Sequence, residues 1–366
     1  MSVARHNLLK DKTRLALSIG GVALAVMLIL LLNGFLAGIY RQITLYLDRS
    51  PGSILVAQRG VSNLLAVTSI LPPGTAAAAE EIEGVAGVVP ILSQFVILDL
   101  HGKKQPAYMV GYVPEKGGGP WQLASGRAPA SDEEVVFDRV LAERHAMQLG
   151  DTVEVMGQEF IVVGLSEGTT SWMTSFFFIR KSAAESLLRA PEVTSFLLVT
   201  PAASAGPADV VTRLSQLPGV NALLKSEAAV NDLQVFARAF SAPLKLMTAI
   251  AFLVGTLVVG LVIYTATVEK QREYGVLKAI GASNGLLYRV VTAQALIAAL
   301  LGVVAGVLLA YAASQWIMAV RPQFLVVIEP ADAGRAIASG LGMALLAALF
   351  PVRVLAGLAP AEVFRR

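Results

Sequence analysis

Four long stretches without a charged residue constrain the fold of this chain more than any other feature. They cover residues 15–40, 246–268, 290–320 and 336–352. A helix needs roughly 20 apolar residues to cross the hydrocarbon core of a bilayer, so the first three are long enough and the fourth is at the lower limit. Charged residues make up 15% of the chain, against about 25% in soluble domains. The sequence therefore predicts a protein with four transmembrane helices, and it excludes an ordinary soluble enzyme, a disordered chain and a fibre.

A secretory signal peptide is the alternative for the first stretch. Its apolar run is much longer than the roughly 7–15 residues of a signal-peptide core, and no convincing A-x-A cleavage site follows Tyr40. We therefore expect residues 15–40 to be an uncleaved transmembrane helix.

Basic residues in the short segments predict the orientation. Eleven Lys and Arg residues fall in residues 1–14, 269–289 and 353–366, whereas residues 321–335 hold only two. Segments rich in Lys and Arg stay in the cytoplasm, so both termini are expected there and residues 41–245 outside. We expect a multi-pass membrane protein in contact with the lipid bilayer. The net charge of +3 follows largely from this bias, so no nucleic-acid partner is expected.

The block outside the membrane, residues 41–245, has the pattern of an α+β domain. A helix followed by a strand occurs within residues 75–100 and again within 208–225, which indicates two related halves that pack together. Between them lies a β-rich insert near residues 120–172, with Val- and Ile-rich strands. Residues 229–245 are predicted to be a stalk helix that leads directly into the second span.

Motifs that carry chemistry are nearly absent from the sequence. The chain has no cysteine, its histidines (His6, His101 and His145) have no metal-ligand spacing, and it contains no GxxxxGK[ST] phosphate-binding loop. A G-x-S-x-G match at residues 281–285 is interpreted as a break between two helices, not as a nucleophile elbow. We predict no catalytic residue, no metal site and no cofactor bound by this chain.

Two pairs of glycines have the GxxxG spacing that lets helices approach closely. Gly34 and Gly38 lie in the first span, and Gly302 and Gly306 lie in the third. Packing within one chain and contact between two copies are both consistent with this spacing.

The connection after the second span, residues 269–289, is predicted to contain an exposed amphipathic helix. An apolar stripe on such a helix needs a partner groove or the membrane surface to cover it, and a plain juxtamembrane helix is the alternative. The charged face carries Glu269, Arg272 and Glu273, and the apolar face carries Tyr274, Leu277 and Ile280 or Gly281.

Three parts of the sequence resemble one family. Residues 268–283 resemble the motif that follows the second span of FtsX-like permeases, although Tyr274 stands where that family commonly has Ile. The tail, residues 350–365, resembles the family's closing Pro-Ala-Glu pattern. The outer insert, with its G-R-x-P, E-V-V, L-G-D-x-V and F-x-V-V-G runs, is similar to the periplasmic core domain of MacB-type exporters. Residues 5–51 look closest to the DevC-like branch.

This resemblance implies a four-helix membrane protein with a MacB-like α+β domain inserted between helices 1 and 2. It also implies the permease subunit of an ABC complex, in which two copies pair with two cytosolic ATPase subunits that bind ATP and Mg²⁺. Mechanical transmission to the outer domain would then drive export or extraction of a substrate, with a membrane-fusion adaptor as a possible partner. The residues that the resemblance assigns to the ATPase contact are Glu269, Arg272, Glu273, Gly275, Leu277, Lys278, Ala279 and Gly281.

Two other functions stay open at the level of the sequence. One is an FtsX-like regulator that uses the same machine to activate a cell-wall hydrolase without moving cargo. The other is a membrane-anchored enzyme or receptor without an ATPase, which the lack of a catalytic constellation disfavours.

Overall fold

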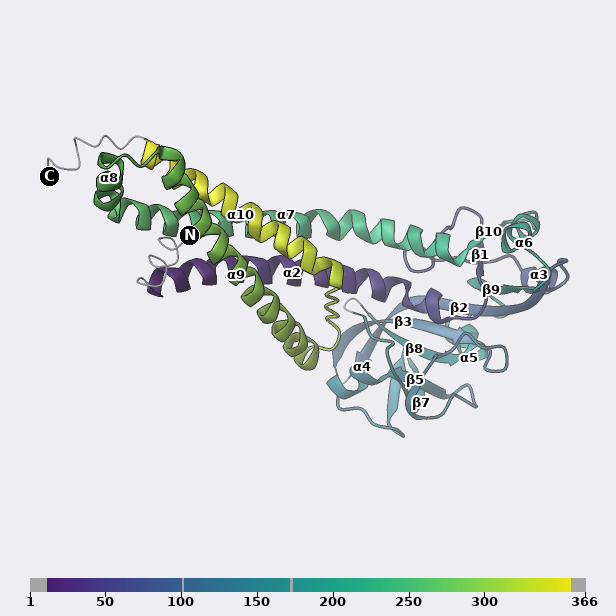
Figure 1. Ribbon diagram of the computed structural model, residues 1–366. Helices are drawn as coiled ribbons and strands as arrows, with labels where there is room; N and C mark the ends of the chain where they lie inside the picture. The colour runs from purple at the N-terminus through teal and green to yellow at the C-terminus, as the bar shows by residue number, and fades with distance from the viewer. Residues whose placement is uncertain (1–11, 101, 172–173, 357–366) are drawn as a thin grey trace. The chain divides into compact units, whose positions relative to one another are not determined.

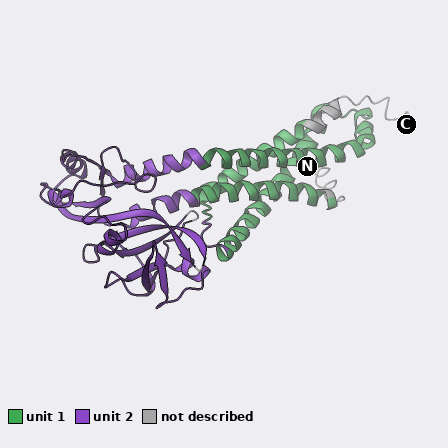
Figure 2. Ribbon diagram, turned by 180° about the vertical axis from the view of Figure 1, so that it is seen from behind, with its two compact units in different colours: residues 1–37, 240–320, 326–366 green, residues 38–239, 321–325 purple. Residues whose placement is uncertain are grey.

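The computed structural model describes residues 12–356 except residues 101, 172 and 173, with the side chains of residues 12, 14 and 350–356 left out. The predicted Pro-Ala-Glu motif near the C-terminus therefore lies outside the described residues. The chain divides into two compact units (Figure 2). The helical unit comprises residues 1–37, 240–320 and 326–366, and the α/β unit comprises residues 38–239 and 321–325.

Among the described residues, four helices are long and apolar enough to cross a membrane. They are α2 (Lys12–Arg49), α7 (Lys225–Glu269), α9 (Asn284–Val320) and α10 (Pro330–Ala356), and the short α8 (Gln271–Ala279) joins α7 to α9 (Figure 1). Two of them run well beyond the apolar stretches. Helix α2 continues past Tyr40 to Arg49, where Pro51 and Gly52 follow, and α7 begins at Lys225 instead of residue 229.

Glycines let the four long helices pack closely in the helical unit. A methyl group at Gly255 of α7 would lie 2.5 Å from Cβ of Ala25 on α2, and one at Gly340 of α10 would lie 2.2 Å from a methyl of Val303 on α9. Association of helices in a membrane depends on such close approach, because lipid offers no hydrophobic driving force.

The predicted pair of helix–strand units forms one sheet in the α/β unit. The first half is β1 (Ile54–Gln58), α3 (Thr75–Glu80) and β2 (Val85–Leu100), and the second is β9 (Phe196–Pro201), α6 (Pro207–Leu214) and β10 (Val220–Leu224). The strand order is β10-β1-β9-β2 with every pair antiparallel, so the two halves interleave as in a ferredoxin-like fold. Apolar side chains from both helices and from this sheet form one core.

A second group of strands is inserted between β2 and β9. Its elements are β3 (Lys103–Tyr112), β4 (Leu123–Gly126), β5 (Glu134–Asp138), α4 (Arg139–Arg144), β6 (Thr152–Val155), β7 (Gln158–Ser166), β8 (Ser175–Arg180) and α5 (Lys181–Leu187). The sheet continues from β2 through β3, β8, β5 and β7 to β4, and β6 pairs with β7.

The insert is larger than the predicted range 120–172 because β2 belongs to both groups of strands. Residues 85–91 of β2 pair with β9, and residues 92–100 pair with β3. No linker separates the two parts, so no change of composition marks the boundary in the sequence.

Candidate functional site

The connection between α7 and α9 is a helix with well-defined ends. One residue, Lys270, separates Glu269 of α7 from α8. After α8 the chain turns through Gly281, whose φ of +98° lies in the left-handed region that favours glycine. The N–H groups of Gly281 and Ala282 donate to the carbonyl oxygens of Lys278 (3.0 Å) and Leu277 (2.9 Å), which is the hydrogen-bond pattern of a Schellman cap.

The G-x-S-x-G match forms the start of α9. Oγ of Ser283 accepts a hydrogen bond from the N–H of Leu286 (3.4 Å), as the N-cap residue of a helix does. Ser283 is exposed, and the segment is the helix break that the sequence predicts.

One face of α8 packs inward. Tyr274 is only 4% exposed and joins the apolar core that α2, α7, α9 and α10 form, and Leu277 packs against the same core. Gly275 is also buried. The apolar face predicted from Tyr274 and Leu277 therefore holds α8 against its own chain, which corrects the expectation that Leu277 belongs to an exposed stripe.

A different set of side chains is exposed on α8. Arg272, Glu273, Val276, Ala279 and Ile280 follow each other at helical spacing and are all exposed, with Ile280 at 76% and Val276 at 43%. We call these five residues the α8 face. Of the other predicted contact residues, Glu269 and Gly281 are exposed and Lys278 is half-buried. Sequence reasoning missed Val276, since periodicity alone does not tell which of two apolar stripes faces the bundle.

Both GxxxG pairs pack against other segments of the same chain. A methyl group at Gly302 would lie 2.5 Å from Cβ of Val22, and one at Gly306 would lie 2.7 Å from the carbonyl oxygen of Ala23, so this pair packs against α2. The pair in α2, Gly34 and Gly38, contacts the connection between α9 and α10.

Buried polar contacts fasten the start of α7 in the α/β unit. The fully buried carboxylate of Asp232 accepts hydrogen bonds from the N–H groups of Leu64 (2.9 Å) and Leu65 (3.0 Å). The neighbouring residue Asn231 adds a contact, in which its Nδ2 donates to the carbonyl oxygen of Ser62 (2.9 Å). The loop between β1 and α3 is thus tied to the side of α7.

The end of α2 is held in the same unit. Oη of Tyr46 donates to the carbonyl oxygen of Gly118 (2.7 Å), and its ring stacks on Phe176 with centroids 5.7 Å apart. Nζ of Lys225 donates to the carbonyl oxygens of Ser50 (2.7 Å) and Gly52 (3.0 Å), so the first residue of α7 binds the turn that ends α2.

The motif residues of the insert stabilise its fold and do not form a reactive centre. Arg127 binds Glu134 through two hydrogen bonds (2.6 and 2.5 Å), and this contact holds the pKa of the Glu134 carboxyl at about 2. A methyl group at Gly126 would lie 2.2 Å from the carbonyl oxygen of Val163, and one at Gly164 would lie 2.4 Å from that of Arg127. The motif therefore closes β4 and β5 onto β7.

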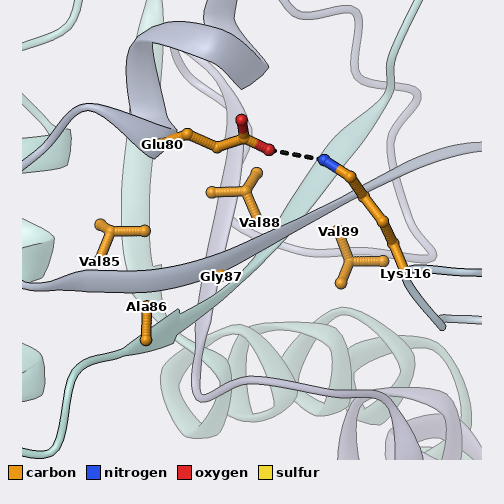
Figure 3. A pocket seen from close by; sticks show the side chains of 7 residues that line it. All are labelled: Glu80, Val85, Ala86, Gly87, Val88, Val89 and Lys116. Carbon is orange, nitrogen blue, oxygen red and sulfur yellow. Dashed lines mark hydrogen bonds and ion pairs between the residues drawn. The ribbon is translucent and has the colours of Figure 1, made fainter.

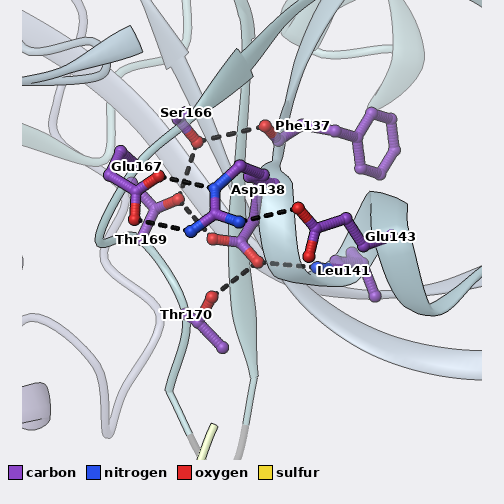
Figure 4. Close-up of polar contacts among 9 residues, drawn as sticks. Phe137, Asp138, Leu141, Glu143, Ser166, Glu167, Thr169 and Thr170 are labelled. Carbon is purple, nitrogen blue, oxygen red and sulfur yellow. Dashed lines mark hydrogen bonds and ion pairs between the residues drawn. The ribbon is translucent and has the colours of Figure 1, made fainter. Parts of the chain in front are cut away.

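A buried carboxylate organises the loop after β7 (Figure 4). Asp138 is fully buried and accepts hydrogen bonds from Oγ1 of Thr169 (2.7 Å), Oγ1 of Thr170 (2.6 Å) and the N–H of Leu141 (2.8 Å). Burial raises the pKa of Asp138, and the threonine hydrogen bonds act in the opposite direction. Beside it, Arg139 pairs with Glu143 and Glu167.

Replacing Asp138 with alanine is expected to destabilise the α/β unit. Three donors would lose a buried acceptor, and each such loss costs about 1–3 kcal/mol. We expect about 3 kcal/mol or more in total, which lowers the melting temperature of a domain of this size by roughly 10 °C. Thermal unfolding of Asp138→Ala measures the effect, and Asp209→Ala on the exposed side of α6 is the control. Equal melting temperatures for both variants would contradict the structural role of Asp138.

A pocket of about 440 Å³ lies beside the first half of β2 (Figure 3). Residues 85–89 line it together with Glu80 and Lys116, whose side chains form an ion pair of 2.6 Å across it. Apart from this ion pair, its lining consists of Val, Ala and Gly residues. Within residues 12–356 that the structure describes, no group of three or more His, Cys, Asp or Glu side chains could hold a metal ion.

Comparison with known proteins agrees with this architecture. Residues 15–217 match the MacB-like periplasmic core domain, and residues 245–360 match the FtsX-like permease C-terminal domain. The chain belongs to the MacB/FtsX family of ABC transporter permeases. The permease has four apolar helices with the MacB-like α+β periplasmic domain between the first and the second, which confirms the predicted fold class.

Relatives of the permease carry the same general name. It is 26% identical over 302 residues, which cover 82% of each chain, to an uncharacterized ABC transporter permease of Mycobacterium tuberculosis. It is 27% identical over 257 residues, covering 69% of this chain and 67% of the relative, to one of Mycobacterium bovis. The solved periplasmic region of MacB from Actinobacillus actinomycetemcomitans matches 49% of this chain and 92% of that chain, at 14% identity and a TM-score of 0.38.

Proposed function

We propose that this permease is the membrane subunit of an ABC complex in which two copies pair with two cytosolic ATPase subunits. The ATPases bind ATP and Mg²⁺, and their closure displaces α8. The displacement moves the periplasmic domain, and this stroke exports or extracts a substrate on the far side of the bacterial cytoplasmic membrane. Both termini and α8 face the cytoplasm in this proposal, as the distribution of Lys and Arg favours.

The continuity of α7 is the observation that carries the proposal. This single helix runs from Lys225 to Glu269 with Pro243 in its interior, and it ends one residue before α8. At 1.5 Å per residue its 45 residues make up about 65–70 Å of helix, roughly twice the length needed to cross a bilayer core. Because the start of α7 is fastened through Asp232 and its end adjoins α8, a push at α8 has a direct path to the periplasmic domain.

The spans themselves favour a mechanical function. The four apolar stretches contain no Asp, Glu, Lys or Arg. Transporters that move ions or polar solutes through the membrane place such groups near its midplane. A stroke that acts outside the membrane needs no such path.

The α8 face supplies the surface for the ATPase. It combines two exposed apolar side chains, Val276 and Ile280, with the charges of Arg272 and Glu273. Such a mixed face fits a groove on a partner, where apolar burial contributes affinity and charged groups fix the orientation.

Purification of the tagged permease from native membranes tests the proposal. We expect an ATPase subunit in the eluate and ATP hydrolysis by the complex. An eluate without ATPase activity would contradict the proposal. A membrane-fusion adaptor in the same eluate would support export, whereas a cell-wall hydrolase would indicate the regulatory function in its place.

A further inference from the structure

The connection between α9 and α10 lies along α2 and is held there at three successive points. The N–H of Val327 donates to the carbonyl oxygen of Gly34 (2.9 Å). A methyl group at Gly38 would lie 1.7 Å from the carbonyl oxygen of Leu325, so only glycine allows this contact. Nε2 of Gln42 donates to the carbonyl oxygen of Gln323 (3.2 Å). We call residues 323–327 the strap.

The spacing of these contacts shows a matched register. From one contact to the next, the residue number on α2 rises by four and the residue number on the strap falls by two. Four residues of an α-helix rise about 6 Å, and two residues of extended chain cover about 6.6 Å. From Leu325 to Val327 the strap runs antiparallel to α2 in the groove of the Gly34–Gly38 pair. Before it, residues 321–324 form a turn in which the N–H of Phe324 donates to the carbonyl oxygen of Arg321 (2.9 Å).

The strap is firmly seated. Val326 and Gln42 are each 6% exposed, and the other residues of the strap are half-buried. Immediately after the strap, the carboxylate of Asp332 accepts a hydrogen bond from the N–H of Glu329 (2.8 Å) and pairs with Arg335, which fixes the first turn of α10. Few residues remain between the end of α9 at Val320 and the seat on α2, so little slack is left.

We propose that the strap is a strut that carries the displacement of α9 and α10 to α2, so that the periplasmic domain is driven through α2 as well as through α7. The proposal rests on the proposed function. Helix α2 is suited to this task because its last turns are locked into the α/β unit by Tyr46, which is 1% exposed. The strap thus adds a second connection between α2 and the last two helices, beside the packing of Gly302 and Gly306 against α2.

A single methyl group tests the strut. Gly38→Ala places a Cβ where the strap lies, and the strap must leave its seat. Gly20→Ala is the matched control, because a methyl at Gly20 of the same helix meets no atom within 4 Å. Alanine is the better helix former of the two residues, so neither change weakens α2 itself.

The readout is the ATP-dependent movement of the periplasmic domain in the complex with the native ATPase. The chain contains no cysteine, so a spin label on Glu154→Cys, an exposed position in β6, is unique in each copy. Pulsed electron resonance then measures the distance between the labels of two copies with and without ATP and vanadate. We expect Gly38→Ala to reduce the ATP-dependent change by roughly half, since α7 still transmits, while Gly20→Ala preserves it.

A second variant guards against a folding defect. Gln42→Leu removes one hydrogen bond of the strap without steric conflict, and we expect a smaller loss in the same direction. Full ATP-dependent movement in Gly38→Ala, with ATPase bound, would overturn the strut. If the unsubstituted complex contains no ATPase or shows no ATP-dependent change, the proposed function itself fails and the strut falls with it.

Discussion

Replacing Ile280 with glutamate is expected to release the ATPase subunit from the permease. Ile280 is the most exposed apolar side chain of the α8 face, and it lies one helical turn from Val276. Burial of an isoleucine side chain contributes about 1.5–3 kcal/mol, and burial of an unpaired carboxylate in its place costs more. Because about 1.4 kcal/mol corresponds to tenfold in affinity, we expect the affinity to fall by roughly 100-fold or more.

The measurement is co-purification of ATPase activity with the tagged permease, and its control is Ile97→Glu. Ile97 lies on β2 of the periplasmic domain and is 66% exposed, so the same change of chemistry occurs at a comparable degree of exposure. Leu277→Glu is unsuitable as a test, because this side chain packs against the interior of the helical unit and its replacement would disturb the fold. Retention of the ATPase by Ile280→Glu would exclude the α8 face as the docking surface.

The sequence predicts most of the architecture because its signals act over long windows. The membrane helices follow from charge-free stretches such as residues 246–268, and the paired halves of the α/β unit follow from a repeated helix–strand pattern. The extension of α2 to Arg49 was missed because polar residues such as Arg41 and Asp48 are compatible with helix but give no hydropathy signal. The insert was predicted too small because one strand, β2, pairs with β9 of the first sheet region and with β3 of the insert.

The candidate site shows where a local pattern is insufficient. Helical periodicity identified one apolar face with Tyr274 and Leu277, but the bundle that covers these two side chains is formed by helices far away in the sequence. The Gly34–Gly38 spacing indicated a close approach, and in the structure the partner is the strap and not a helix. A glycine pair reports that the backbone of α2 is accessible and says nothing of what lies against it.

Replacing Asp232 with alanine is expected to weaken the attachment of α7 to the periplasmic domain. The carboxylate is fully buried and accepts hydrogen bonds from the N–H groups of Leu64 and Leu65. Alanine leaves the buried N–H of Leu64 and the half-buried N–H of Leu65 without this acceptor, at about 1–3 kcal/mol each, and it adds a cavity. We expect a loss of about 3 kcal/mol or more, seen as a melting temperature of the α/β unit lowered by roughly 10 °C.

Two further variants separate the anchor from general effects on α7. Gln234→Ala, on the exposed side of the same helix, is expected to melt within about 1–2 °C of the unsubstituted protein, since exposed positions contribute within about 0.5 kcal/mol. Asp232→Asn retains one acceptor oxygen but turns an NH₂ group toward the backbone donors, so an intermediate loss is expected. A melting temperature of Asp232→Ala equal to that of Gln234→Ala would show that the loop between β1 and α3 does not need this anchor.

The same variant separates docking from transmission. Asp232 lies near the start of α7, and the α8 face follows its far end, so Asp232→Ala should leave ATPase binding intact while the ATP-dependent movement of the periplasmic domain decreases. Ile280→Glu should do the reverse, with a stable periplasmic domain and no ATPase. If both substitutions abolish ATPase binding, α7 contributes only to folding. The proposal that α7 transmits the displacement of α8 to the periplasmic domain would then be wrong.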